Sequence, residues 1–337
     1  MYYSENKALS NKTDSVFNAL NDQQRVGQMI FAAIGELGHS EEYAKNLIIR
    51  DHIGGFVLLK GSKSAHAALI DKLNAVSENK QLIKPLFSID AEPSLYSGRM
   101  QGSFQPGQTI DIKSERASDS IAQLIAQDIK SIGIHQNYAP VIDISPNNEA
   151  IKSRSFGSDP QKVVRLSEAF VKGTQECEVI ATIKHFPGHG LVSGDTHKNM
   201  VFIDGRLKEV INYRPLIEDG VLSVMVAHII VRNNDQYDTN GLPASCSPKI
   251  VTGLLREEYG FNGLIVSDAL NMQAAQEIGK PGLKASMAGC DVILMPLNEA
   301  QTINDILVEI SRNSNFKEQV YESVKRILRM KICLGII

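Results

Sequence analysis

The sequence predicts a single-domain α/β fold, a (β/α)8 barrel of the TIM type. Eight short apolar runs end in polar or glycine residues, and most are continuous, as is typical of strands buried on both faces. Amphipathic stretches lie between the runs, so we expect a parallel sheet with right-handed crossovers. An open doubly wound sheet is the competing fold. It normally has a Gly-rich turn after its first strand, and the first run here leads into GELG.

The strands are expected, in chain order, at 28–35, 53–59, 85–90, 135–143, 179–186, 221–228, 263–268 and 290–296. The clearest helices are expected at 65–79, 117–133, 159–176 and 315–335. Ser118 or Asp119 is a candidate N-cap for the second of these helices. Pro160 follows Asp159 at a plausible first helical position of the third.

Composition excludes several classes of protein. The 337 residues suggest about two domains at ~150 residues each, but α/β barrels of this size form one unit and no low-complexity linker is present. A net charge of -3 argues against a nucleic-acid binder, and no apolar run approaches the ~20 residues of a membrane span. Four scattered cysteines without CxxC spacing exclude a zinc knuckle or a dense disulfide scaffold.

The N-terminal stretch is polar and lacks the apolar core of a secretory signal. We therefore expect a cytoplasmic protein, or a periplasmic or secreted one if a leader precedes residue 1. The sequence contains neither GxGxxG nor GxxxxGK[ST], so we expect neither an organic cofactor nor a metal. A monomer acting on a small substrate is the expected state.

Polar residues at the ends of the expected strands are the strongest functional signal, because the carboxyl ends of barrel strands build the active site. Acidic residues after strands also occur as helix caps, so any one of them could be structural. Lys184 and His185, however, sit inside an otherwise apolar run, where a cation is costly unless a partner or ligand receives it. The strand-end residues are Asp90, Glu92, Asp143, Lys184, His185, His228 and Asp268.

The segment 184–200 contains three histidines within a turn-rich loop. Their spacing matches neither HExxH nor a zinc-finger pair, which disfavours a metal site. Asp195 lies close to His197, and a carboxylate near an imidazole suits a proton donor or acceptor near neutral pH. A solvated loop histidine is the alternative. Asp268 is a candidate nucleophile at the barrel mouth, or a cap of the following helix.

Taken together, these segments resemble glycoside hydrolase family 3 over about residue 23 to the C-terminus. KHFPGHG and DTH resemble the signature loop of that family, and VSDALNM resembles its nucleophile motif. SIDAE, NYAPVIDI and RSFG follow the family's order of strand-end motifs. We therefore expect an N-terminal extension over 1–22 and a catalytic barrel over 23–337.

Within that family, the Asp-x-His pair resembles the β-N-acetylglucosaminidase branch. The resemblance implies Asp268 as the nucleophile of a retaining mechanism, His197 as general acid and base, and Asp195 as its orienting partner. It implies sugar contacts from Asp90, Arg154, Lys184 and His185, with Asp143 and His228 nearby. The implied substrate is a terminal β-linked GlcNAc on a muropeptide, another cell-wall fragment or a chitin-derived oligosaccharide.

One segment departs from the family pattern. The motif that commonly reads DxEGGxVxR is DAEPSLYSGR here, so Pro93 and Ser94 replace glycines and Arg99 lies one position later. Arg99 is accordingly a weaker candidate for sugar binding than Asp90. A β-glucosidase of the same family and a catalytically weak carbohydrate-binding barrel remain as alternatives.

Overall fold

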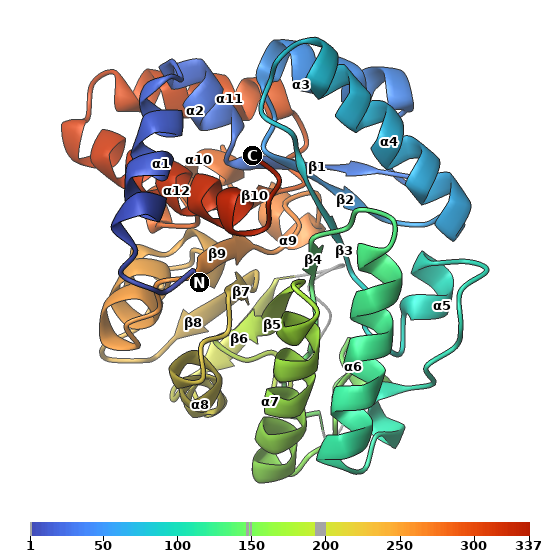
Figure 1. Ribbon diagram of the computed structural model, residues 1–337. Coiled ribbons are helices and arrows are strands. Elements are labelled where there is room, and N and C mark those ends of the chain that lie inside the picture. The colour runs from blue at the N-terminus through green and yellow to red at the C-terminus, as the bar shows by residue number, and fades with distance from the viewer. Residues whose placement is uncertain (1, 146–147, 149, 193–199) are drawn as a thin grey trace.

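The computed structural model describes residues 2–145, 148, 150–192 and 200–337. Eight parallel strands form its central sheet in the order β10-β1-β2-β3-β4-β5-β7-β9 (Figure 1). A parallel bridge between Val266 and Val292 joins the two ends of that order, so the sheet closes. The strands are β1 Ile30–Ile34, β2 Gly55–Leu58, β3 Leu86–Ile89, β4 Gln136–Asn137, β5 Ile180–Phe186, β7 Ser223–Val226, β9 Leu264–Ser267 and β10 Ile293–Leu294.

The predicted barrel is confirmed, and each of the eight predicted runs contains one barrel strand. The strands are shorter than the runs because regular pairing stops before the apolar stretch does. The run 135–143 shows this most clearly, since only Gln136 and Asn137 form β4. Gln136 is fully buried, and its side-chain amide donates to Thr182 Oγ1 (3.0 Å) and Ser223 Oγ (3.1 Å) across the barrel interior.

Helices surround the barrel. They are α1 Lys7–Asn18, α2 Asp22–Gly27, α3 Glu41–Asp51, α4 Lys63–Asn79, α5 Tyr96–Arg99, α6 Glu115–Lys130, α7 Pro160–Glu176, α8 Tyr213–Glu218, α9 Gln273–Gln276, α10 Pro281–Ala288, α11 Glu299–Ile310 and α12 Ser314–Cys333, with a π-helix over Lys249–Glu258. Asp159 caps α7 and Pro160 opens it, as predicted. The caps predicted for α6 are wrong, because Ser114 caps this helix by accepting from Ala117 N. Ser118 lies inside α6, where its buried hydroxyl donates to Leu166 O of α7 at 2.7 Å.

A second, two-stranded parallel sheet lies outside the barrel and was not predicted. It pairs β6 Val201–Asp204 with β8 Ile229–Arg232. Along β6, buried Val201 and Ile203 alternate with exposed Phe202 and Asp204. The sequence does not show this period of two, because the exposed residue Phe202 is itself apolar. The segments VFID and IIVR are short and were not among the eight apolar runs from which the strands were predicted.

The first helix packs against the last one. The Phe17 ring of α1 meets the Tyr321 ring of α12 edge to face, with centroids 5.0 Å apart, and the Arg25 guanidinium lies 4.2 Å from the Phe17 centroid. Figure 1 shows the two helices side by side, in blue and red. Residues 7–18 are thus part of the packed body.

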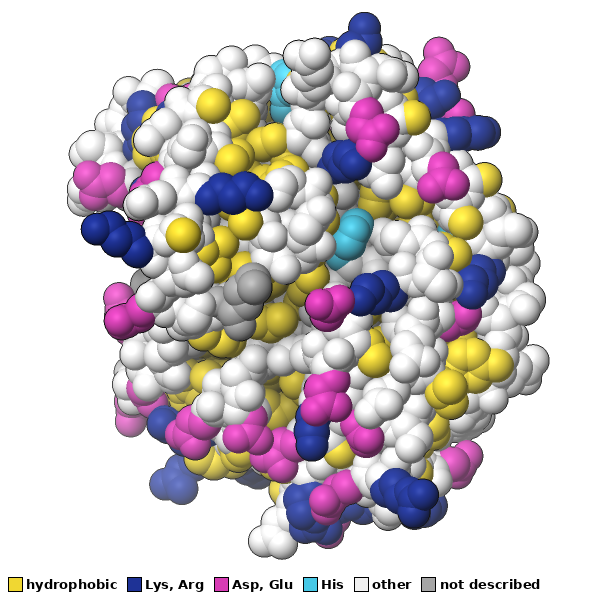
Figure 2. Space-filling model, viewed as in Figure 1, with side chains coloured by type: hydrophobic (Ala, Val, Ile, Leu, Met, Phe, Trp, Pro, Cys, Tyr) yellow, Lys and Arg dark blue, Asp and Glu magenta, His cyan; other side chains and the backbone are white. Residues whose placement is uncertain are grey.

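On the face shown in Figure 2, Lys and Arg side chains are interspersed with Asp and Glu. This mixture agrees with the net charge of -3 for the whole sequence. Among the residues that the structure describes, no helix is both long and apolar enough to cross a membrane.

Candidate active site

A cavity of about 240 Å³ lies at the carboxyl ends of the barrel strands. This is where the loops of a (β/α)8 barrel form its active site. Six of the residues singled out in the sequence line it together: Asp90, Arg99, Arg154, Lys184, His185 and Asp268. Its apolar wall includes Val57, Leu59, Met225, Met272 and Leu294. The lining combines charged side chains with apolar ones.

Lys184, the cation inside the apolar run of β5, is almost completely buried and forms ion pairs with two carboxylates. Its Nζ lies 2.6 Å from Asp90 Oδ1 and 2.7 Å from Glu92 Oε1. An ammonium group has three N–H donors, and these two carboxylates use two of them. Lys184 therefore links Asp90, which lines the cavity, to Glu92, which does not.

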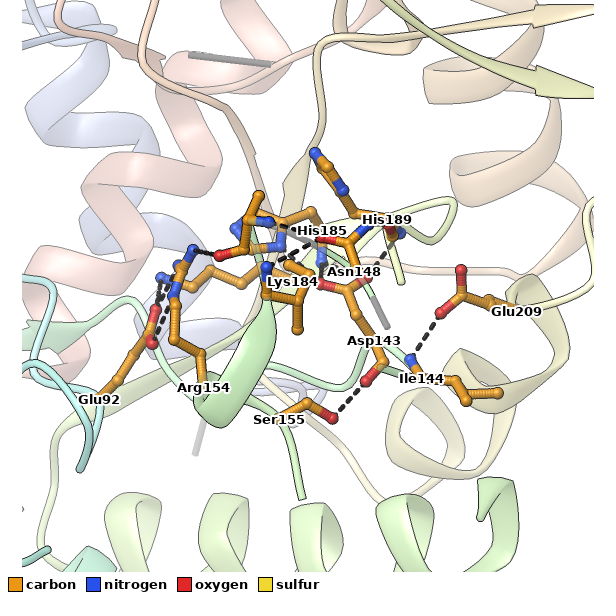
Figure 3. A network of polar contacts seen from close by, with 12 residues as sticks. Glu92, Asp143, Ile144, Asn148, Arg154, Ser155, Lys184, His185, His189 and Glu209 are labelled. Atoms are coloured by element: carbon orange, nitrogen blue, oxygen red, sulfur yellow. Dashed lines mark hydrogen bonds and ion pairs between the residues drawn. The ribbon is translucent and has the colours of Figure 1, made fainter. Parts of the chain in front are cut away.

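Glu92 is the centre of this ionic cluster. It also accepts from Arg154, with Nε at 2.9 Å and Nη2 at 2.6 Å, in the bidentate geometry typical of Arg–carboxylate pairs (Figure 3). Burial alone would raise the pKa of Glu92. The positive charges of Arg154 and Lys184 outweigh that effect and hold this pKa well below its usual range. The lowered pKa keeps Glu92 ionised. The sequence had marked Glu92 only as a residue at a strand end.

The loop after Glu92, whose sequence departs from the family pattern, is held by hydrogen bonds to two other segments. Ser94 Oγ accepts from Thr109 N (2.9 Å) and donates to the carbonyl of Ser153 (2.8 Å), next to Arg154. Arg99 closes the short helix α5, lines the cavity and places Nη2 3.9 Å from Asp90 Oδ2. The structure thus brings Arg99 to the cavity despite the shifted spacing.

His185 is oriented by a buried carboxylate. Its Nδ1 lies 2.6 Å from Asp143 Oδ2, so an Nδ1–H donates there and the other ring nitrogen is left for the cavity (Figure 3). Burial would raise the pKa of Asp143, but the charge and hydrogen bond of His185 lower it overall. The backbone N–H groups of His185 and His189 also donate to Asp143. Asp143 therefore fixes both the ring and the turn that follows β5.

His228 does not line the cavity. It is fully buried, with Nδ1 2.7 Å from Ser245 Oγ and Nε2 3.1 Å from the carbonyl of Ala269. Asp268 precedes that carbonyl in the chain, lines the cavity and accepts from Ala269 N at 2.8 Å. His228 thus contacts the backbone that presents Asp268.

Two further residues of this region were not among the predicted site residues. His189 lines the cavity, and its ring meets that of His185 edge to face, with centroids 5.9 Å apart. Glu209, a buried carboxyl, accepts from Ile144 N at 2.6 Å and Leu191 N at 3.0 Å. Glu209 carries no sequence signal, because it lies in a segment without a strand-end pattern.

Asp195 and His197 lie outside the described residues. Among the described side chains, no group of three or more His, Cys, Asp or Glu residues is arranged to hold a metal ion. His185 and His189 stand in the cavity wall as a pair with Asp143 behind them. That arrangement suits hydrogen bonding to a neutral polar ligand.

The chain is similar to known proteins over most of its length. Residues 22–330 match the family described as "Glycosyl hydrolase family 3 N terminal domain". "Beta-hexosaminidase A" of Pseudoalteromonas piscicida is 31% identical over 324 residues, covering 85% of this chain and 54% of the relative. "Beta-hexosaminidase" of Stenotrophomonas maltophilia (strain R551-3) is 31% identical over 268 residues, covering 73% of this chain and 76% of the relative.

The fold is also shared with solved structures. A glycoside hydrolase family 3 β-N-acetylglucosaminidase from Paenibacillus sp. str. FPU-7 superposes with a TM-score of 0.86 at 30% identity, covering 94% of this chain and 63% of that one. A β-N-acetylhexosaminidase from Beutenbergia cavernae has the same fold, with a TM-score of 0.83 and 24% identity. The chain spans about half the length of the Pseudoalteromonas relative and less than two thirds of the Paenibacillus protein.

Proposed function

This chain belongs to glycosyl hydrolase family 3, and from that premise we propose that it is a retaining exo-β-N-acetylglucosaminidase. One observation carries the proposal. Asp268 lines the same cavity as the ionic cluster of Asp90, Arg154 and Lys184. A carboxylate at a barrel mouth can attack an electrophilic carbon, while charged donors and acceptors around it hold sugar hydroxyls.

The reaction runs in two steps. The Asp268 carboxylate attacks the anomeric carbon, the bond to the leaving oxygen breaks, and protonated His197 gives its proton to that oxygen. A water molecule then attacks the anomeric carbon and passes a proton to His197. The sugar leaves with a hydroxyl and Asp268 recovers its carboxylate. The neutral imidazole does not repel the carboxylate that departs in the second step.

The described residues supply binding and orientation. Asp90 offers acceptor oxygens and Lys184 a compact donor to sugar hydroxyls, while Arg154 presents a rigid guanidinium. At about 240 Å³, the cavity is smaller than the ~300–1,000 Å³ typical of drug-sized ligand sites. This size supports recognition of one terminal sugar rather than a long chain, and hence an exo mode of cleavage.

The choice of GlcNAc is supported by the names of the relatives and by the Asp195-x-His197 sequence. Two curated relatives are β-hexosaminidases, and the Paenibacillus protein is a β-N-acetylglucosaminidase. We propose cell-wall fragments such as muropeptides, or chitooligosaccharides, as the natural source of the terminal sugar.

The test compares aryl β-GlcNAc with aryl β-glucoside for the wild-type protein and for Asp268→Ala and Asp268→Asn. We expect wild-type turnover to favour the GlcNAc substrate, and both variants to lose turnover while circular dichroism shows them folded. Mass spectrometry should detect a glycosyl-enzyme on Asp268 in the wild type. Near-normal turnover by either variant would refute the nucleophile, and a preference for the glucoside would refute the substrate.

A further inference from the structure

The turn 185–192, at the carboxyl end of β5, is held by buried side chains from other parts of the chain. Glu209 immediately precedes a short 3-10 helix and is 4% exposed. Its carboxyl connects the turn 185–192 to the loop that follows β4. Its Oε1 accepts from Ile144 N and its Oε2 from Leu191 N, and Gly190 N also donates to the carboxyl. Figure 3 shows Glu209 pointing at Ile144, beside Asp143 and His189.

Two other side chains complete this attachment. The Asp143 carboxylate accepts from His185 N and His189 N, as described above. Asn148 Nδ2 donates to the carbonyls of His189 (2.8 Å) and Val192 (2.7 Å). Three buried polar residues therefore satisfy backbone N–H and C=O groups along the turn.

The packing around Glu209 leaves little freedom. Gly188 has a φ of +126°, and a Cβ placed there would lie 2.4 Å from Glu209 Cβ. A Cβ at Gly190 would lie 1.8 Å from the carbonyl oxygen of Ile144. At Gly188 and Gly190 the turn lies too close to Glu209 and to Ile144 for any residue that has a Cβ.

We infer that Glu209 is a positioning residue of the active site, a role that rests on the proposed function. It does not line the sugar cavity, whereas His185 and His189 do. By fastening Gly190 and Leu191 to Ile144, it sets where the backbone on either side of His189 lies. It also holds Ile144, so that Asp143 keeps its position against the His185 ring.

The charges around Glu209 do not favour a carboxyl at this position, so the role rests on its hydrogen bonds. Burial, and then the negative charge of Asp143, raise the pKa of Glu209 to about 8, against the three backbone N–H groups that lower it. Placing a second carboxyl beside buried Asp143 is therefore unfavourable, and the N–H groups offset only part of that cost. A glutamine in place of Glu209 would keep the shape of the side chain, but its NH₂ group would face a backbone N–H donor.

The test uses Glu209→Gln with Glu218→Gln as its control, since Glu218 is an exposed glutamate of α8. Ring ¹⁵N resonances of His185 and His189, assigned from their Gln variants, report the geometry without relying on turnover. Steady-state kinetics on aryl β-GlcNAc report the consequence. We expect Glu209→Gln to shift both ring resonances and to lower kcat/KM by at least about tenfold, because small misplacements of site residues are costly. Glu218→Gln should do neither.

A second pair of variants keeps the inference testable if Glu209→Gln does not fold. Leu191→Pro removes one N–H donor to Glu209, and Leu191→Ala, which keeps that N–H, is its reference. The same shifts should then separate Pro from Ala. Unchanged ring resonances, or kcat/KM within twofold of the control in a folded variant, would overturn the inference. If the wild-type protein does not cleave GlcNAc, the proposed function fails while the resonances still decide the role of Glu209.

Discussion

The Glu92→Gln substitution removes the negative charge that Lys184 and Arg154 share. Glu92 is 1% exposed, and its two oxygens accept three hydrogen bonds at 2.6 to 2.9 Å from the two cations. Glutamine keeps the volume but can accept through one oxygen only, and its NH₂ group faces a cation. Lys184 would then keep only the carboxylate of Asp90, and Arg154 would lose its carboxylate partner.

Breaking a buried ion pair by removing one partner costs about 3–5 kcal/mol. We expect the lower end, because Asp90 still receives Lys184. An unfolding entropy of about 2.1 cal/mol/K per residue amounts to about 0.7 kcal/mol/K for the 337 residues. A loss of about 3 kcal/mol should therefore lower Tm by about 4 °C.

The measurement is thermal unfolding followed by circular dichroism at pH 7, with Glu178→Gln as the control. Glu178 pairs with Lys130 on the surface at 78% side-chain exposure, so its loss should leave Tm unchanged within error. Because the pKa of Glu92 is lowered on folding, its contribution is present above the unfolded value of about 4.3 and is lost as pH falls. The Tm difference should accordingly shrink below that pH. Equal Tm values for the two variants at pH 7 would refute the reasoning.

Two further predictions concern other parts of the protein. Burial lowers the pKa of Lys331, which donates to Gln28 Oε1 and to the carbonyl of Lys84, to about 7. Between that value and the unfolded value of about 10.4 the unfolded chain binds more protons, so stability should rise with pH. Urea unfolding at pH 7, 8 and 9 should show this rise in the wild type and a flatter profile in Lys331→Met; an identical slope would contradict it. Turnover of aryl β-GlcNAc should be unaffected by EDTA, whereas a loss restored by zinc would show that the histidines hold a metal.

Local pattern was sufficient for most of the barrel. Most barrel strands lie in a continuous apolar run, with the polar strand β4 as an exception, and helices such as α7 carry Asp159 and Pro160 at their start. It was insufficient where a choice depended on distant packing. Ser114 rather than Ser118 caps α6. Ser118 lies inside the helix, where its hydroxyl donates to the carbonyl of Leu166 in α7. The outer pair β6 and β8 was not predicted, because it forms outside the barrel through the pairing of two short segments that are distant in the sequence.

The candidate site shows the same division. The cation inside β5 indicated that Lys184 must find a buried partner, and its neighbours proved to be Asp90 and Glu92. Which carboxylate it would meet was not evident, since the acidic strand-end residues are chemically alike. Glu209 was missed altogether, because its hydrogen bonds run to backbone atoms that no sequence pattern marks.

By itself, the sequence determined the alternation of strands and helices, the family resemblance and the set of residues at the strand ends. These features depend on neighbouring residues and on the requirement that apolar segments be buried. Only the tertiary structure decided the pairings, with Glu92 between Arg154 and Lys184, Asp143 behind His185, and Glu209 under the turn. The pairings join residues 18 to 92 positions apart. Barrel closure and strand register bring them together, and a buried charge bonds whichever partner that geometry places within reach.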